Sequence, residues 1–226
     1  MSAPPPLLPL RRILNEGHSP PQVLASGDTQ VLDTCSIVNW LRENKDRLLY
    51  TACYCEENIY KLAEMISEEA EENKKNYVVF ISSLSLQTPI WKQKSAENNS
   101  IAVIWDYHVV LLLSNCLIVD FDSKLDFPCP AVEYYEEAFR PEVYLPDDNA
   151  QRFRVVPAQE FLEYFATDRS HMIGSKAPIP SWECLRGSKA GIDMNLSRFF
   201  DVSESSTFEH GKVMSKDQFL AFLTEA

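Results

Sequence analysis

The sequence predicts an α+β fold in which helices flank an antiparallel sheet. Two observations support this prediction. Between residues 59 and 66, apolar side chains recur at i, i+3, i+4 and i+7, the spacing of an amphipathic helix. Two apolar and β-branched runs, at 101–113 and 116–122, are separated by a short polar pair. That pattern is typical of an antiparallel hairpin.

The chain begins with a segment unlike the rest. Residues 1–30 are rich in proline and show little periodicity, which predicts disorder. The prolines also interrupt any apolar stretch, so a secretory signal is not expected. Residues 36–48 are expected to form a short helix packed on the domain. We therefore divide the chain into a partly disordered N-terminal extension, 1–47, and a single domain, 48–226.

The other elements follow from composition and spacing. Strands are expected at 77–83, 88–92, 101–113, 116–122 and 152–156, and helices at 131–139, 157–166 and 194–200. A last helix is expected to begin at Ser215, because Gln218 gives the spacing of a capping box. Its apolar face would bury Phe219, Phe222 and Leu223.

Cys55 stands where the first strongly periodic helix is expected to begin. Glu56 and Glu57 follow in its first turn, where acidic side chains suit the helix dipole. A thiol at a helix start faces unpaired N–H groups, so we expect a lowered pKa and an oxyanion site there. Cys53 is the rival position, and both cysteines could instead be buried packing residues.

His108 and Asp120 fall on the two strands of the expected hairpin. In an antiparallel pair, the residue numbers of two facing positions always add up to the same value. His108 and Asp120 therefore share a face only if the connection is odd in length or a bulge shifts the register. A connection centred on Ser114 would set His108 directly opposite Asp120, whereas a two-residue turn would separate them. Asp106 and Asp122 would share the face of His108. The alternative for His108 is a core histidine bonded to backbone.

Cysteine, histidine and aspartate form the residue set for thiol-based acyl transfer. The thiolate attacks a carbonyl carbon, the imidazole moves protons, and the carboxylate orients the imidazole.

Residues 105–109 read WDYHV. Eight further segments belong with this motif: Cys53–Asn58, Val79–Ser82, Pro89–Lys94, Asp120–Asp122, Phe127–Cys129, Phe153–Val156, Phe165–Met172 and Met194–Leu196. In sequence and order, the motif and these segments resemble the protein N-terminal glutamine amidohydrolases, over about residues 49–200. The chain departs from that pattern in its long extension, at Phe121, at 123–126 and at 178–182.

The resemblance implies a catalytic triad of Cys55, His108 and Asp120. It implies hydrolytic deamidation of the N-terminal glutamine of proteins and peptides to glutamate, with release of ammonia, through a thioester on Cys55. No metal or other cofactor is expected. In the family this reaction prepares the N-terminus for arginylation and degradation through the N-end rule (N-degron) pathway. A cysteine-bearing helix on such a sheet also resembles the papain and transglutaminase-like cysteine hydrolases.

Selectivity for an N-terminal residue requires a group that recognises the free α-ammonium. The candidates for this substrate-binding role are Asp106, Glu56 and Glu57. The alternative for the two glutamates is simple complementarity to the helix dipole. The alternative for Asp106 is a structural hydrogen bond near Trp105 or Tyr107.

Composition limits the partners. The net charge of −12 and the pI of about 4.8 argue against nucleic-acid binding. No apolar run approaches the roughly 18 residues of a membrane span. The six cysteines form no regular framework, so we expect reduced cysteines in an intracellular protein. The resemblance implies a cytoplasmic or nuclear location, and we expect a monomer. Zinc ligation by Cys53 and Cys55 with His171 or Cys184 lacks a supporting spacing.

Two other function classes remain open from the sequence. A cysteine peptidase or transglutaminase-like acyltransferase would use the same triad. Activity on internal peptide bonds would distinguish a peptidase of this kind from an N-terminal glutamine amidohydrolase. A non-catalytic module that binds N-termini would have no use for an activated thiol.

Overall fold

A computed structural model describes residues 34–67, 76–113 and 117–225 of the chain. One sequence prediction, the disorder of residues 1–30, falls on residues outside these ranges. Within the described ranges, no helix is long and apolar enough to cross a membrane.

A six-stranded antiparallel sheet forms the centre of the fold, in the order β6-β5-β4-β1-β7-β8. Its strands are β1 (Tyr77–Ser82), β4 (Tyr107–Leu113), β5 (Leu117–Val119), β6 (Cys129–Pro130), β7 (Arg152–Pro157) and β8 (Lys212–Met214). A separate pair joins β2 (Thr88–Ile90) to β3 (Val103–Trp105). The predicted α+β architecture, an antiparallel sheet flanked by helices, is therefore confirmed.

The sheet is covered on both faces, because its central strands carry apolar side chains in both directions. All residues of β4 are buried, and successive side chains point to opposite faces. Val109 and Leu111 belong to a hydrophobic cluster on one face. Val110 and Leu112 belong to a second cluster on the other. Burial on both faces explains the continuous apolar run in the sequence.

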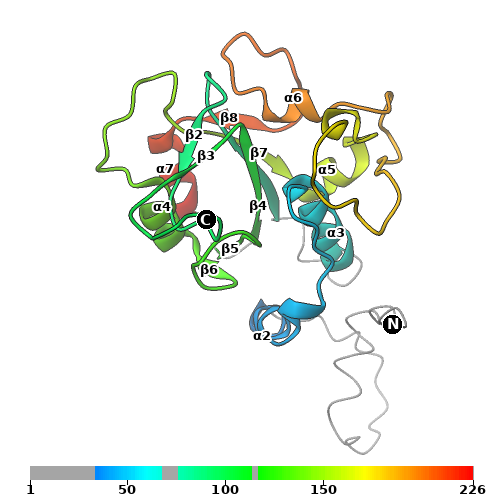
Figure 1. The fold of residues 1–226 in the computed structure, drawn as a ribbon, viewed down its shortest axis with the longest axis horizontal. Coiled ribbons are helices and arrows are strands. Elements are labelled where there is room, and N and C mark those ends of the chain that lie inside the picture. The colour runs from blue at the N-terminus through cyan, green and yellow to red at the C-terminus, as the bar shows by residue number, and fades with distance from the viewer. Residues whose placement is uncertain (1–33, 68–75, 114–116, 226) are drawn as a thin grey trace, which may run out of the picture.

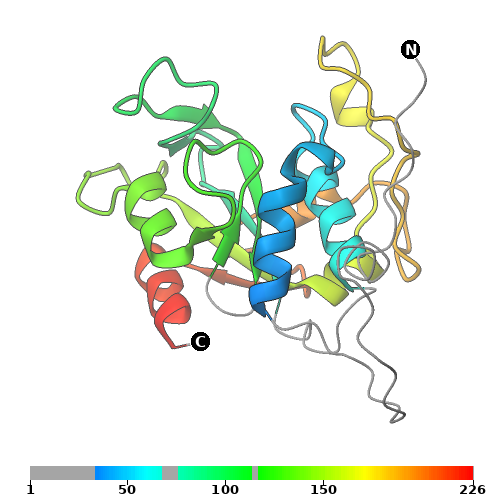
Figure 2. The same ribbon diagram turned by 90° about the horizontal axis from the view of Figure 1, so that it is seen from below.

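Two groups of helices supply the rest of these clusters (Figures 1 and 2). The first face is packed by α2 (Thr34–Asn44), α3 (Cys55–Ser67), α5 (Ala158–Tyr164) and α6 (Leu196–Phe200). The second face is packed by α4 (Ala131–Phe139) and α7 (Lys216–Thr224). The expected apolar stripe of α3 is buried throughout. The expected capping box of Ser215 and Gln218 opens α7.

The helix expected at 36–48 is present as α2, followed by the 3-10 helix η1 (Lys45–Arg47). Trp40 and Leu41 of α2 are buried in the same cluster as α3. The described part of the segment assigned to the extension therefore packs on the domain.

Several elements differ from the sequence prediction. The strand expected at 101–113 is broken at Asp106 into β3 and β4, which belong to different sheets. The strand expected at 116–122 already ends at Val119. Strands β6 and β8 and the 3-10 helix η3 (Ser170–Met172) were not predicted, because two or three residues carry no detectable periodicity.

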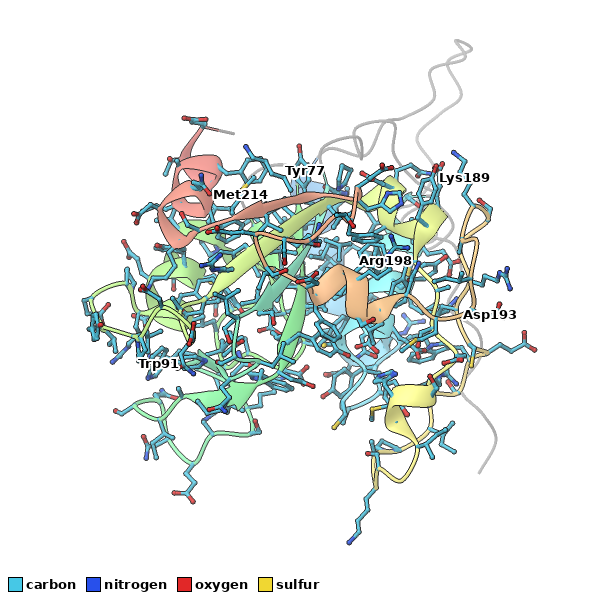
Figure 3. The ribbon with its side chains drawn as sticks, turned by 90° about the horizontal axis from the view of Figure 1, so that it is seen from above. Tyr77, Trp91, Lys189, Asp193, Arg198 and Met214 are labelled. Carbon is cyan, nitrogen blue, oxygen red and sulfur yellow. The ribbon has the colours of Figure 1, made fainter. Side chains whose placement is uncertain are left out.

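Backbone hydrogen bonds tie the long connections to neighbouring helices. Figure 3 shows Trp91, which follows β2, on the opposite side of the molecule from Lys189, which lies between α5 and α6. The Trp91 N–H donates to the Ala138 carbonyl of α4 at 2.9 Å, and the Lys189 N–H donates to the Glu163 carbonyl of α5 at 2.8 Å. These bonds tie the start of the connection after β2 to α4, and the connection between α5 and α6 to α5.

Phe80 of β1 tests this account of the core. It is fully buried, stacks on Phe199 of α6 at 5.4 Å and meets Phe161 of α5 edge-on at 5.6 Å. Phe80→Ala should lower the free energy of unfolding by about 3–5 kcal/mol through lost burial and a cavity, as measured by urea unfolding. Tyr144→Ala, at a residue that is 88% exposed, should change it by less than about 0.5 kcal/mol. Equal losses for the two variants would contradict the assignment of the core.

Candidate active site

Cys55 is the first residue of α3, as the sequence predicted, and it lies at the edge of β4. Strand β5 pairs with β4 only from Leu111 to Leu113, so β4 extends past the end of β5. In this stretch the Val109 backbone donates a hydrogen bond to the Cys55 thiol. The early end of β5 therefore leaves room for the thiol beside the sheet.

His108 and Asp120 form a buried pair beside this edge. His108 Nε2 lies 2.9 Å from Asp120 Oδ1, and the two residues are 0% and 4% exposed. Three further donors hold the same carboxylate: the Asp122 N–H at 2.8 Å, the Tyr134 hydroxyl at 2.7 Å and the Gln93 amide at 3.3 Å. The carboxylate is thus fixed from several directions.

The parity prediction for the hairpin is confirmed. Leu111 pairs with Val119, so odd-numbered residues face odd-numbered ones and His108 shares a face with Asp120. The exact register differs from the expected one. Continued beyond the end of β5, it would set Asp122 opposite His108, and Asp120 therefore reaches His108 as a diagonal neighbour.

Mutual attraction fixes the protonation of this pair. Burial alone would lower the pKa of His108 and raise that of Asp120. The charge and hydrogen bond of the partner outweigh burial in each case, so the pKa of His108 is raised and that of Asp120 falls to about 2. Asp120 is thus ionised at neutral pH and accepts the proton of His108 Nε2. The basic nitrogen is then Nδ1, which is buried and has no hydrogen-bond partner in the described part of the chain.

The predicted lowering of the Cys55 pKa is wrong. Burial raises the pKa of this thiol, and the neighbouring Glu56 and Asp122 carboxylates add to the rise. The hydrogen bond from Val109 acts in the opposite direction, but it is outweighed because a buried thiolate loses its hydration. The thiol donates a hydrogen bond to Glu56 Oε2 at 3.6 Å.

Glu57 is completely buried rather than solvated in the first turn of α3. Arg169 donates to its two carboxylate oxygens at 2.8 and 2.7 Å, and the Trp182 indole N–H donates at 2.7 Å. These bonds anchor the connection that carries η3 to the start of α3. The role of Glu57 seen here is therefore structural.

Glu56 is also completely buried, but its two oxygens differ. Oε2 accepts hydrogen bonds from the Cys55 thiol at 3.6 Å and from the Tyr107 hydroxyl at 3.1 Å. Oε1 lies 3.6 Å from His171 Nε2, and among the described residues it has no hydrogen-bond partner. Burial raises the pKa of Glu56 to about 7.

Comparison with known proteins agrees with this geometry. Residues 50–223 match the family model described as N-terminal glutamine amidase. The chain belongs to this family. Similar proteins named protein N-terminal glutamine amidohydrolase occur in Bos taurus and Danio rerio, each 38% identical to this chain. The two alignments cover 78% and 77% of this chain and 87% and 89% of the relative. The Drosophila melanogaster protein of that name is 41% identical over 59% of this chain and 66% of its own length.

Asp106 lies inside the WDYHV motif, but not on the strand face predicted for it. It is exposed and occupies the break between β3 and β4. Its carboxylate accepts the Tyr107 backbone N–H at 2.9 Å, and its carbonyl accepts the Ser82 hydroxyl at 2.8 Å. This is the structural hydrogen bond that the sequence analysis named as the alternative.

Cys53 is separate from these groups. It is an exposed, free cysteine in the loop before α3, with a positive φ of 69°. Cys55 is buried and contacts β4. The structure thus brings Cys55, His108 and Asp120 to one edge of the sheet and leaves Cys53 outside.

Several residues around the site were missed from the sequence. Trp105 stacks on the His108 ring at 4.9 Å, and Gln93 holds Asp120. Both lie within segments that resemble the N-terminal glutamine amidohydrolases, which was the only signal for them. Tyr134 and Arg169 come from remote elements, so no local pattern could have identified their partners.

His108, Asp120 and Asp122 are the one described group whose ligand-type atoms lie within 4.8 Å of one another. In this arrangement His108 Nε2 and Asp120 bond to each other, and Asp122 accepts the Tyr50 hydroxyl at 2.6 Å. The three groups therefore serve as hydrogen-bond partners for one another and for Tyr50.

The raised pKa of Glu56 has a consequence for stability. Between about pH 4.5 and 7 the folded chain keeps a proton that the unfolded chain has lost, so stability falls as pH rises through this window. Relative to the wild type, Glu56→Gln should therefore gain about 2–3 kcal/mol of unfolding free energy between pH 5 and pH 8. Urea unfolding at both pH values measures this gain. Glu204→Gln, at a side chain that is 92% exposed, is the control. Parallel pH curves for wild type and Glu56→Gln would contradict the prediction.

Proposed function

We propose that this protein hydrolyses the side-chain amide of N-terminal glutamine, forming N-terminal glutamate and ammonia, with Cys55, His108 and Asp120 as the catalytic triad. The observation that carries the proposal is the buried His108–Asp120 pair at the sheet edge beside Cys55, in a chain of the N-terminal glutamine amidase family. Family membership supports the substrate, and the pair supports the acid–base chemistry.

The first half of the reaction acylates the thiol. Since the Cys55 thiol is protonated in the free protein, His108 Nδ1 removes its proton as sulfur attacks the side-chain carbonyl carbon. The first N–H groups of α3 have no partner within the helix and can hold the oxyanion, beginning with that of Cys55. His108 then protonates the amide nitrogen. The carbon–nitrogen bond breaks, ammonia leaves, and a thioester remains on Cys55.

The second half returns the enzyme to its initial state. His108 Nδ1 takes a proton from water, and the resulting hydroxide attacks the thioester carbon. The carbon–sulfur bond breaks, and the proton on His108 returns to sulfur. Asp120 stays ionised throughout, keeps the Nε2 proton in place and stabilises the imidazolium. Trp105 holds the ring plane.

A helix-borne cysteine beside a strand that carries histidine supports a further proposal, that the fold is papain- or transglutaminase-like. On the resemblance alone, we also propose that the product enters the N-degron pathway, that the protein acts in the cytoplasm or nucleus, and that it works as a monomer.

Two neighbouring cysteines allow a matched test of the nucleophile. Cys55→Ser should lower turnover of a Gln-starting peptide by more than about 10³-fold, because serine lacks the nucleophilicity of a thiol. Cys53→Ser should keep at least about half of the activity, because Cys53 is exposed and outside the site. Ammonia release and peptide mass spectrometry measure both. An inactive Cys53→Ser with an active Cys55→Ser would reverse the assignment.

A panel of peptides tests the substrate. Peptides that begin with glutamine should be deamidated, while N-acetylated glutamine, internal glutamine and N-terminal asparagine should react at least about 100-fold more slowly, because each removes or misplaces a recognised group. Mass spectrometry follows all four in parallel. Comparable turnover of internal glutamine, or cleavage of the peptide chain, would favour a transglutaminase-like acyltransferase or a cysteine peptidase instead.

A further inference from the structure

The triad mechanism leaves one buried ionisable group of the site unused. Glu56 is 0% exposed and directly follows Cys55 in the first turn of α3. Among the described residues its Oε1 atom accepts no hydrogen bond. An unsatisfied buried carboxylate oxygen is costly, so this atom marks a place where a donor is missing.

Glu57, the residue after Glu56, shows how a buried carboxylate is satisfied by hydrogen-bond donors in this region. Glu57 is paired with the Arg169 guanidinium and the Trp182 indole. The charged or titratable groups that surround the Glu56 carboxylate come from several elements and are Tyr54, Cys55, Glu57, Tyr107, His108 and His171. Two of these, the Cys55 thiol and the Tyr107 phenol, donate to Oε2. None is a permanent cation.

His171 does not supply the missing charge. Its Nε2 atom is 3.6 Å from Glu56 Oε1, beyond hydrogen-bonding distance, and burial lowers its pKa, so the ring is neutral at pH 7. Its side chain is 24% exposed and belongs to η3, which lies next to the start of α3 in Figure 2. The partly exposed His171 ring therefore lies between the buried Oε1 atom and the protein surface.

We propose that Glu56 Oε1 binds the α-ammonium group of the substrate and thereby restricts the enzyme to N-terminal glutamine. This inference rests on the proposed function. Glu56 would be a specificity-determining residue rather than a member of the triad. Asp106 and Glu57, the two other acidic candidates from the sequence, already accept hydrogen bonds from the Tyr107 backbone and from Arg169.

The spacing of the site matches the length of glutamine. Four bonds separate the α-nitrogen of glutamine from its side-chain carbonyl carbon, a span of about 5 Å when extended. The Cys55 thiol and the Glu56 carboxylate are 3.6 Å apart at their nearest atoms and are held by consecutive helix residues. An ammonium at Oε1 thus leaves the carboxamide within reach of the thiol. Asparagine is one bond shorter, and an error of about 1 Å in position can cost 100-fold in rate.

Binding would also change the protonation of the site. Glu56 holds a proton below about pH 7 in the free protein because it is buried. An adjacent ammonium favours the ionised carboxylate, so the proton of Glu56 leaves to solvent when the substrate binds. The ligand then satisfies the unpaired oxygen and neutralises the buried charge together.

The decisive experiment compares two substrates in two enzymes. One peptide begins with glutamine, and the other carries a 4-carbamoylbutanoyl group in its place, which is glutamine without the α-amino group. Wild type should prefer the first by at least about 100-fold in kcat/KM, and Glu56→Gln should reduce this preference to less than about tenfold. The ratio cancels any general loss of activity in the variant. Asp106→Asn is the matched control and should keep the preference.

A second measurement leaves Glu56 in place. Cys55→Ala binds peptide without turnover, and calorimetry in several buffers at pH 6 counts the protons released. The glutamine peptide should release most of one proton, whereas the 4-carbamoylbutanoyl peptide should release none. His171→Asn in the same background removes one of the other nearby titratable groups, the one that faces Oε1, and should not abolish the release.

The outcomes separate the two proposals. If wild type released no ammonia from either peptide, the proposed function would fail. If wild type were active but Glu56→Gln kept the full preference, only the role of Glu56 would be overturned. Loss of the preference in Asp106→Asn, or absence of proton release in Cys55→Ala, would overturn it equally.

Discussion

The Asp120 carboxylate organises this site. It is buried, so its charge is tolerable only because donors surround it: His108 from β4, Tyr134 from α4, Gln93 from the connection after β2, and the backbone of Asp122. These elements come from distant parts of the chain. Satisfying one anion therefore fixes the relative positions of the histidine, the helix on the second face and the connection that follows β2.

The two faces of the sheet carry different parts of the site. The first face carries α3 and the thiol, and the second face carries α4 and the support for Asp120. The Cys55 thiol is bonded to the Val109 backbone at the edge of β4, where the two faces meet. Burial raises the pKa of this thiol, so the sulfur is protonated at neutral pH. A protonated, buried thiol is also less susceptible to non-specific oxidation, since the thiolate is the reactive form.

Much of this site could be predicted from the sequence, for identifiable reasons. The position of Cys55 follows from a local periodicity, and the shared face of His108 and Asp120 follows from parity within one hairpin. The break at Asp106 could not be predicted, because β-branched and aromatic residues continue across it. Nor could the burial of Glu56 and Glu57. Acidic residues in a first turn are usually solvated, and only the remote Arg169, Trp182 and Tyr107 reveal that these two are not. The pKa of Cys55 was predicted with the wrong sign because burial is a tertiary property.

The early end of β5 at Val119 has a consequence for how such a fold can lose or gain activity. Two more residues of regular pairing would extend the ladder along β4 to Val109 and occupy the backbone N–H that now bonds the sulfur. The thiol would then be displaced although every reactive side chain remained. Under the proposed mechanism, activity depends on this interruption of secondary structure, and lengthening β5 alone would make the enzyme inert.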